Sequence, residues 1–193
     1  MEKTELLLQA LETEIGGTEI YEMALKCVQN KDLKGELQKY LEQTRHHVDV
    51  VQNILEQLEI KVGTPSPGRK VVHHIGQSLV KAMEMALKEG PPEAAELVAL
   101  ECITFAETKD HMNWELIGEL ASHEKGELAK LLQAAYKEIE PDEDEHLYHG
   151  SGWAREMWMQ ALGLPAVIPP PEEQKDVRTA IGAARAKASR EKM

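Results

Sequence analysis

The sequence predicts an all-α protein built as a four-helix bundle, in which a long crossover joins two antiparallel helical hairpins. Apolar residues return at three- and four-residue intervals along most of the chain, which is the spacing of one helix face. Alternating β-branched segments bounded by turn residues, the usual signal for strands, are nearly absent. Short connections within each hairpin and a long one between them are typical of such a bundle. The 193 residues are enough for one well-buried domain.

The first hairpin is expected over residues 4–59. Its first helix, residues 4–29, has an apolar stripe made of Leu7, Leu8, Leu11, Ile15 and Leu25. Residues 30–32 break this pattern, and Asp32 offers its side chain as the N-cap of a second helix that runs to about Glu59. Because the break is only three residues long, the two helices should lie side by side and antiparallel.

The crossover and the second hairpin follow. Residues 62–68 are rich in glycine and proline, which predicts a loop because proline lacks the backbone donor that a helix needs. A helix over residues 70–88 is interpreted as the crossover element. The third bundle helix is expected over residues 92–110, a turn at residues 111–113, and the fourth helix over residues 114–138.

Beyond the fourth helix the sequence changes in character, which predicts a bundle over residues 1–138 and an extension over residues 139–193. Six acids in eight residues, 138–145, indicate a solvated linker. Residues 153–162 are expected to form a short helix. Four prolines within residues 165–171 predict an extended arm, and a basic, alanine-rich tail ends the chain.

Composition and charge exclude several classes of function. The formal charge of −12 argues against nucleic acid or an anionic membrane as the main partner. No apolar run is long enough to span a membrane, and the first ten residues lack the basic and then apolar pattern of a signal peptide. Cys27 and Cys102 lack the spacing of a zinc site or a disulfide framework. These observations favour a soluble, cytoplasmic protein.

Two glutamates fall on the apolar stripes of the predicted third and fourth helices. At about 100° per residue, Glu101 lies in the middle of one stripe and Glu124 in the middle of the other, with Glu127 about 60° to one side. Glu101 is 11 residues before Met112 and Glu124 is 12 residues after it. If the turn is at Met112, the two carboxylates face each other at the same height.

The first hairpin gives a parallel result. Glu14 lies 17 residues before Lys31 and His47 lies 16 residues after it, so these side chains are also level. Glu14 flanks the apolar stripe of its helix, where Glu22 is a competing choice, and His47 lies about 60° from the centre of the next stripe. The other seven histidines are expected at the surface or in turns.

Several buried carboxylates need a counter-charge, because an unpaired buried carboxylate is costly or must hold a proton. Two divalent ions would balance four glutamates, and neutral His47 would add a nitrogen ligand without changing the charge. The alternative is that these acids form salt bridges with lysine or arginine. The sequence therefore predicts a metal centre with the ligands Glu14, His47, Glu101, Glu124 and Glu127.

This pattern resembles the ferritin-like di-iron carboxylate superfamily, in which two helices each give one glutamate and two give a Glu-x-x-His pair. Glu14 followed by Tyr21, in ETEIGGTEIYEMAL, is similar to the first helix of bacterioferritin-type proteins. YLEQTRHHV, HHIGQSLVKAMEM, LECITF and SHEKGELAKLL resemble the bacterial YciE/YciF-like stress-protein branch. The resemblance covers roughly residues 4–137.

The resemblance implies iron as the metal, with manganese as an alternative, and an oxidoreductase of ferroxidase or peroxidase type that acts on Fe(II), O2 or peroxide in stress protection. Glu124 would bridge two ions, the other four residues would be terminal ligands, and Tyr21 would hydrogen-bond behind them. The chain departs from the family in having Thr44-x-x-His47 and Glu124-x-x-Glu127. With fewer bridging groups, a mononuclear centre also stays open.

The competing hypothesis is a metal-free, ferritin-like bundle that acts as an interaction module. The first helix has a second apolar face, formed by Leu6, Ala10, Ile20, Ala24 and Val28. Such a face must be covered. The crossover helix, the C-terminal arm or a second copy of the chain could cover it, and a homodimer is the preferred expectation.

Overall fold

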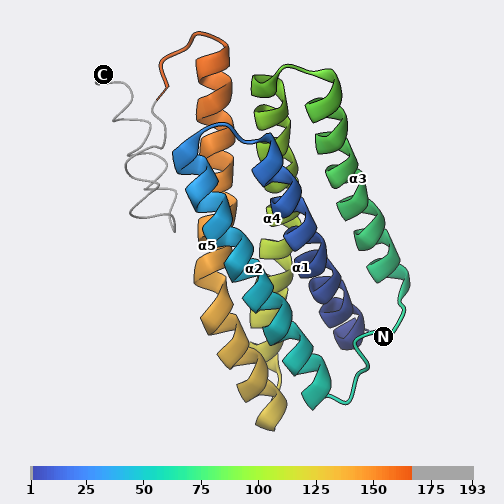
Figure 1. Cartoon of the computed structure of the whole chain (residues 1–193). Coiled ribbons are helices and arrows are strands. Elements are labelled where there is room, and N and C mark those ends of the chain that lie inside the picture. Colours follow the sequence, from blue (N-terminus) through green and yellow to red (C-terminus); the bar gives the residue numbers. More distant parts are fainter. Residues whose placement is uncertain (1, 167–193) are drawn as a thin grey trace.

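The computed structural model of this protein describes residues 2–166, and that part of the chain is all-α. It contains five helices and no strand: α1 (Glu2–Cys27), α2 (Lys31–Gln57), α3 (Pro67–Glu89), α4 (Pro92–His123) and α5 (Gly126–Ala161) (Figure 1). The predicted all-α class is confirmed. Within the same residues, none of the helices combines the length and the apolar character that crossing a bilayer requires.

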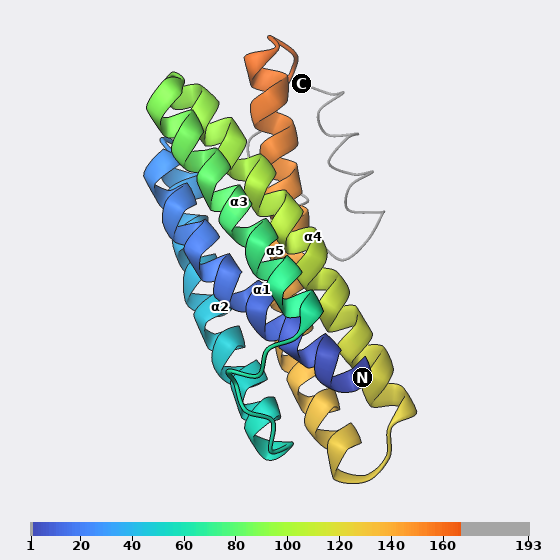
Figure 2. The same ribbon diagram turned by 90° about the vertical axis from the view of Figure 1, so that its right-hand side faces the viewer.

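Four of the helices pack in a ring, and the fifth lies outside it. α1 packs on α2 and α4, and α5 packs on α4 and α2, which closes the ring. Successive helices run in opposite directions (Figure 1). α3 connects the two hairpins and lies along α1 and α4 on the outer side of the bundle (Figure 2). The interior of the bundle is therefore lined by α1, α2, α4 and α5.

The helix starts follow local capping chemistry. Asn30, rather than the predicted Asp32, is the N-cap of α2, because its side-chain oxygen accepts hydrogen bonds from the backbone N–H groups of Asp32 and Leu33. Asp32 instead supplies a negative charge in the first turn of α2, where the helix dipole favours it. Ser66 caps α3 by accepting from Arg69 N.

The predicted turn at residues 111–113 is wrong, because α4 continues through it to His123. The buried side of α4 carries on past this point with Asn113, Trp114, Ile117 and Ala121. The chain reverses instead at Glu124–Lys125, and Gly126 begins α5 with a φ of 71°, a conformation that suits glycine. The second hairpin is therefore displaced toward the C-terminus.

The acidic stretch at 138–145, predicted to be a linker, lies inside α5, which also contains the predicted short helix at 153–162. The predicted boundary between residues 138 and 139 thus falls within one helix. Pro141 removes only one backbone donor from α5, and its neighbours keep the helical spacing of buried residues, namely Leu132, Ala135, Ile139, Glu143, His146, Gly150 and Trp153. The proline-rich arm and the basic tail fall largely beyond residue 166, outside the described residues.

The second apolar face of α1 is covered within the chain. Ile20, Ala24 and Val28 are buried in a core cluster with Met83, the buried residue of α3, and with apolar residues of α4. This face is therefore accounted for without a second copy. The apolar core has two parts, one around Tyr21, Tyr40 and Trp153 and the other around Leu11, Ile54 and Trp114. Between them lies a group of buried polar side chains.

Candidate metal centre

Six buried polar residues meet inside the ring of four helices, between the two parts of the apolar core. α1 supplies Glu14, α2 supplies His47, α4 supplies Glu107 and Asp110, and α5 supplies Glu143 and His146. All six residues are at most 4% exposed. The four acids and two histidines are hereafter called the centre.

The ligand atoms of five of the six residues, all except Asp110, fall into two overlapping groups. Oxygen and nitrogen atoms of Glu14, His47 and Glu143 lie within 4.8 Å of one another. Atoms of Glu107, Glu143 and His146 form a second such group, so Glu143 belongs to both. The rings of His47 and His146 are stacked, with centroids 5.7 Å apart and planes at 23°. The centre thus offers two adjacent positions for a cation with one carboxylate between them.

Each of the six side chains has one buried atom without a hydrogen bond of acceptable geometry to the described residues: Glu14 Oε2, His47 Nδ1, Glu107 Oε2, Asp110 Oδ1, Glu143 Oε2 and His146 Nδ1. The closest ion-pair contact of any of these atoms is 3.0 Å, between His47 Nδ1 and Glu143 Oε1. An unsatisfied buried polar atom costs about 1–3 kcal/mol. Six would cost on the order of 10 kcal/mol, comparable with the stability of a whole domain, about 5–15 kcal/mol.

The two histidines are oriented in the same way. Nε2 of His47 contacts Asp142 Oδ2 at 3.5 Å, and Nε2 of His146 contacts Gln43 Oε1 at 3.1 Å. An outward Nε2–H held by an oxygen leaves Nδ1 as the inward-facing nitrogen. Histidines that bind metals usually have their second ring nitrogen held in this manner.

Two of the carboxylates also accept a hydrogen bond, on one oxygen each, from an aromatic side chain outside the centre. Trp114 Nε1 donates to Glu14 Oε1 at 2.7 Å, and the hydroxyl of Tyr21 donates to Glu107 Oε1 at 2.7 Å. In both cases the second oxygen, Oε2, is one of the unsatisfied atoms of the centre. An aromatic donor therefore fixes each carboxylate and leaves one oxygen directed inward.

Burial and crowding shift the protonation of the centre. Burial is the largest cause that raises the pKa of Glu143 to about 7; the charges of Glu14 and Glu107 act in the same direction, and the hydrogen bond with His47 and the charge of His146 oppose them. Burial, together with the same carboxylates, raises the pKa of Asp110 well above its ordinary value. Burial lowers the pKa of His47, but Glu14 and the contacts to Asp142 and Glu143 outweigh this and raise it to about 12. Without a cation, the centre retains protons at neutral pH.

Asp110 provides a fourth carboxylate, while Thr44 on α2 provides none. Thr44 is one helical turn before His47, and its hydroxyl donates to the backbone oxygen of Tyr40 at 2.9 Å. A side-chain methyl of Thr44 also packs toward α1, since a Cβ added at Gly17 would lie 3.1 Å from it. The four carboxylates of the centre are thus distributed as one on α1, two on α4 and one on α5.

Of the residues predicted from the sequence, the structure brings together Glu14, His47 and Tyr21. Glu101 and Glu124 do not face each other, because both lie on the α4 side of the turn, 23 residues or about 35 Å of helix apart. Their predicted pairing across a hairpin is wrong. Glu101 accepts from Trp158 Nε1 at 3.0 Å, and Glu124 pairs with Lys3.

Glu127 also lies away from the centre. Its side chain is 89% exposed and pairs with Lys130 at 2.8 Å. The residues that sequence reasoning missed are Glu107, Asp110, Glu143 and His146. A signal for the last two was present, because Glu143-x-x-His146 is the only Glu-x-x-His in the chain. The sequence-based prediction does not include this motif, because it places the turn at residues 111–113 and interprets residues 138–145 as a solvated linker.

Comparison with known proteins adds no further information on the centre. No protein-family model matches the chain, and neither the curated proteins nor the solved structures gave a significant match.

Proposed function

We propose that this chain is a ferritin-like metal protein that binds two divalent ions, with iron as the preferred metal, and that it oxidises Fe(II) with O2 or peroxide. The observation that carries the proposal is the set of six buried oxygen and nitrogen atoms without a hydrogen bond, of which five belong to the residues of the two ligand groups. Ion-pair contacts of the two histidines with Glu14, Glu107 and Glu143 compensate part of this cost, but they leave these atoms without a hydrogen bond of good geometry. Two divalent ions would satisfy them and balance the charge of four carboxylates.

The distribution of these residues supports the ferritin-like assignment. Such centres take one glutamate from each of two helices and a Glu-x-x-His motif from each of the other two. Here Glu14 and Glu107 are the single glutamates on α1 and α4, and Glu143-x-x-His146 is the motif on α5. α2 keeps the histidine, His47, but not the glutamate. Asp110 supplies the carboxylate that α2 lacks.

The geometry supports a specific division of ligands. Glu14 and His47 would hold one ion and Glu107 and His146 the other, and Asp110, on which the charges of Glu14, Glu143 and Glu107 act, would add a nearby carboxylate. Glu143, which belongs to both groups, would bridge the ions. Carboxylate and imidazole ligands suit iron, manganese and zinc, so metal identity has to be measured.

The chain's own residues define the conditions for the reaction. When bound, two Fe(II) ions would supply the two electrons that, together with two protons from solvent, reduce one hydrogen peroxide to two waters. Trp114 and Tyr21 keep the carboxylates in place, and the apolar clusters on either side restrict water. Protons held by Glu143, Asp110 and His47 in the metal-free state would have to leave as metal enters, which makes binding pH-dependent.

The test is anaerobic titration of metal-free protein with Fe(II), followed by exposure to O2 or peroxide and measurement of the Fe(III) absorbance. We expect about two ions per chain. The Glu143→Gln variant should bind neither ion, because the substitution removes the ligand that both ions share. The Glu14→Gln variant should bind one of the two ions more weakly. Manganese in place of iron should give the same stoichiometry.

Glu124→Gln is the matched control, because it removes a carboxylate from the end of α4, outside the centre, and should leave both binding and oxidation unchanged. A stoichiometry below about a tenth of an ion per chain, after reconstitution at neutral pH, would overturn the proposal and leave the metal-free interaction module. Binding without oxidation would retain the metal site and reject the redox activity.

A further inference from the structure

A second candidate site lies on the outer side of the bundle, where α3 covers α1 and α4. A chamber of about 540 Å³ opens between these three helices. Its volume falls within the range of small-molecule sites, about 300–1,000 Å³. None of the six residues of the centre lines it. This inference therefore does not depend on the proposed metal chemistry.

The chamber wall is mostly apolar and partly exposed. Val71 and Ile75 from α3 and Phe105 from α4 line it, and they are 57%, 52% and 68% exposed. These are among the most exposed large apolar side chains of the described residues. Because monomeric proteins seldom leave such side chains together in water, an apolar group is expected to cover them.

The polar groups on the wall leave one positive charge without an acidic partner. The carboxylate of Glu12 is already paired, with Arg69 Nε at 2.6 Å and His73 Nδ1 at 2.9 Å. Lys109, from α4, donates to the side-chain oxygen of Asn113, and no carboxylate among the side chains described in residues 3–166 lies within ion-pair distance of its ammonium, although the charge of Asp110 acts on it from further away. The chamber thus combines an apolar wall with one half-buried cation that has no ion-pair partner among the described side chains.

We propose that this chamber binds a free long-chain fatty acid, with its carboxylate on Lys109 and its alkyl chain against Val71, Ile75 and Phe105. Charge complementarity selects an anionic head group, since the acid on the wall is neutralised and the lysine is not. The apolar wall selects an alkyl chain. A membrane surface is disfavoured as the source of the lipid, because the chain carries a formal charge of −12.

The test is titration of the full chain with dodecanoate and tetradecanoate, below their micelle concentrations, by calorimetry. We expect one site per chain and about fifteenfold tighter binding of tetradecanoate, since each buried methylene contributes a factor of about four. Dodecan-1-ol has a similar chain without the charge and should bind at least tenfold more weakly than dodecanoate.

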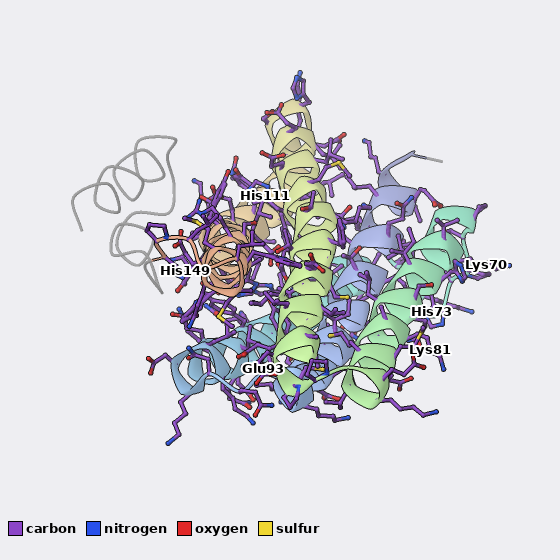
Figure 3. The ribbon with its side chains drawn as sticks, turned by 90° about the horizontal axis from the view of Figure 1, so that it is seen from above. Lys70, His73, Lys81, Glu93, His111 and His149 are labelled. Atoms are coloured by element: carbon purple, nitrogen blue, oxygen red, sulfur yellow. The ribbon has the colours of Figure 1, made fainter. Side chains whose placement is uncertain are left out.

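Three variants separate the contributions. Lys109→Met keeps an apolar stem but removes the charge, and should reduce dodecanoate affinity at least tenfold with no effect on dodecan-1-ol. Lys81→Met is the matched control, because Lys81 is an exposed lysine on α3 (Figure 3) and is not among the residues that line the chamber. Ile75→Glu changes an exposed wall residue and should abolish binding of both ligands. Thermal melts will establish that each variant is folded.

Several outcomes would overturn the proposal. These are the absence of dodecanoate binding to the unmodified chain, equal affinities of the unmodified chain and Lys109→Met, or co-sedimentation with phosphatidylglycerol vesicles in place of one-site binding. A dimer in sedimentation analysis that Ile75→Glu dissociates would assign this face to a second copy instead.

Discussion

Replacing Glu143 by glutamine should stabilise the metal-free protein at pH 8, even though it removes a group from the interior. Glu143 is buried, and its pKa is raised to about 7 from an ordinary 4.5. The folded chain therefore holds this proton more tightly than the unfolded chain does. The contribution of Glu143 to the free energy of unfolding is therefore fully present below pH 4.5 and is lost as the pH rises through about 7.

The size of the effect follows from the difference between the two pKa values. A carboxyl with a pKa of about 7 when folded and 4.5 when unfolded lowers the free energy of unfolding by about 3 kcal/mol at pH 8. Glutamine has nearly the same shape and no charge, so this loss should disappear. For a domain of this size the gain corresponds to roughly 10 °C in Tm.

The assay is urea or thermal unfolding of chelator-treated protein between pH 4.5 and 8. Glu143→Gln should match the unmodified chain near pH 4.5 and exceed it progressively above that. Glu127→Gln, which changes an exposed carboxylate of the same helix, should stay within about 0.5 kcal/mol throughout. A Glu143→Gln variant that is less stable at pH 8 would refute the reasoning, because Glu143 would then stabilise the fold through its histidine contacts.

Three further predictions address metal binding, the tyrosine that hydrogen-bonds to the centre, and the fold. Stabilisation by Mn(II), measured as the rise in Tm at fixed metal concentration, should grow from pH 5 to pH 8 because the ion displaces protons; a flat profile would contradict the buried ligand set. Tyr21→Phe removes the donor to Glu107 and should weaken metal binding about 10- to 100-fold in a calorimetric titration, whereas an unchanged affinity would show that this hydrogen bond does not orient the ligand. Asn30→Ala removes the N-cap of α2 and should cost about 1 kcal/mol in urea unfolding, with metal stoichiometry unchanged; a loss below about 0.3 kcal/mol would contradict the capping role.

The all-α class and the positions of α1, α2 and α3 could be predicted because their signals are local. Periodic apolar residues mark these helices, and a short polar break or a proline-rich loop separates them. The level placement of Glu14 and His47 follows from counting residues on either side of one short turn. The structure brings these two side chains within 3.5 Å of each other.

The second hairpin could not be placed correctly, because α4 carries apolar residues on more than one side. Phe105 lies one helical turn after Glu101, on the apolar stripe that periodicity predicts to be buried, but it is 68% exposed, while Glu107 and Asp110 lie on the side that faces the ring. The burial pattern of α4 depends on α3, which covers part of its outer surface. Periodicity within α4 alone does not contain that information.

The acidic stretch departs from its prediction for a related reason. Its composition predicts solvent exposure, yet Ile139, Glu143 and His146 keep the spacing of a buried helix face. Buried acids are rare, so an acid-rich segment is normally exposed. A metal centre is the exception to that rule, since its ligands are charged and must be inside. The residues that composition excludes from the core are therefore among those that form the centre.

The most direct test of the metal centre is anomalous diffraction from crystals of the full chain soaked with Mn(II). Two anomalous peaks should lie inside the ring of helices, one beside Glu14 and His47 and the other beside Glu107 and His146, with Glu143 between them. Glu143→Gln crystals should lack both peaks. The account would be contradicted by an interior without anomalous signal, with manganese found only at exposed acids.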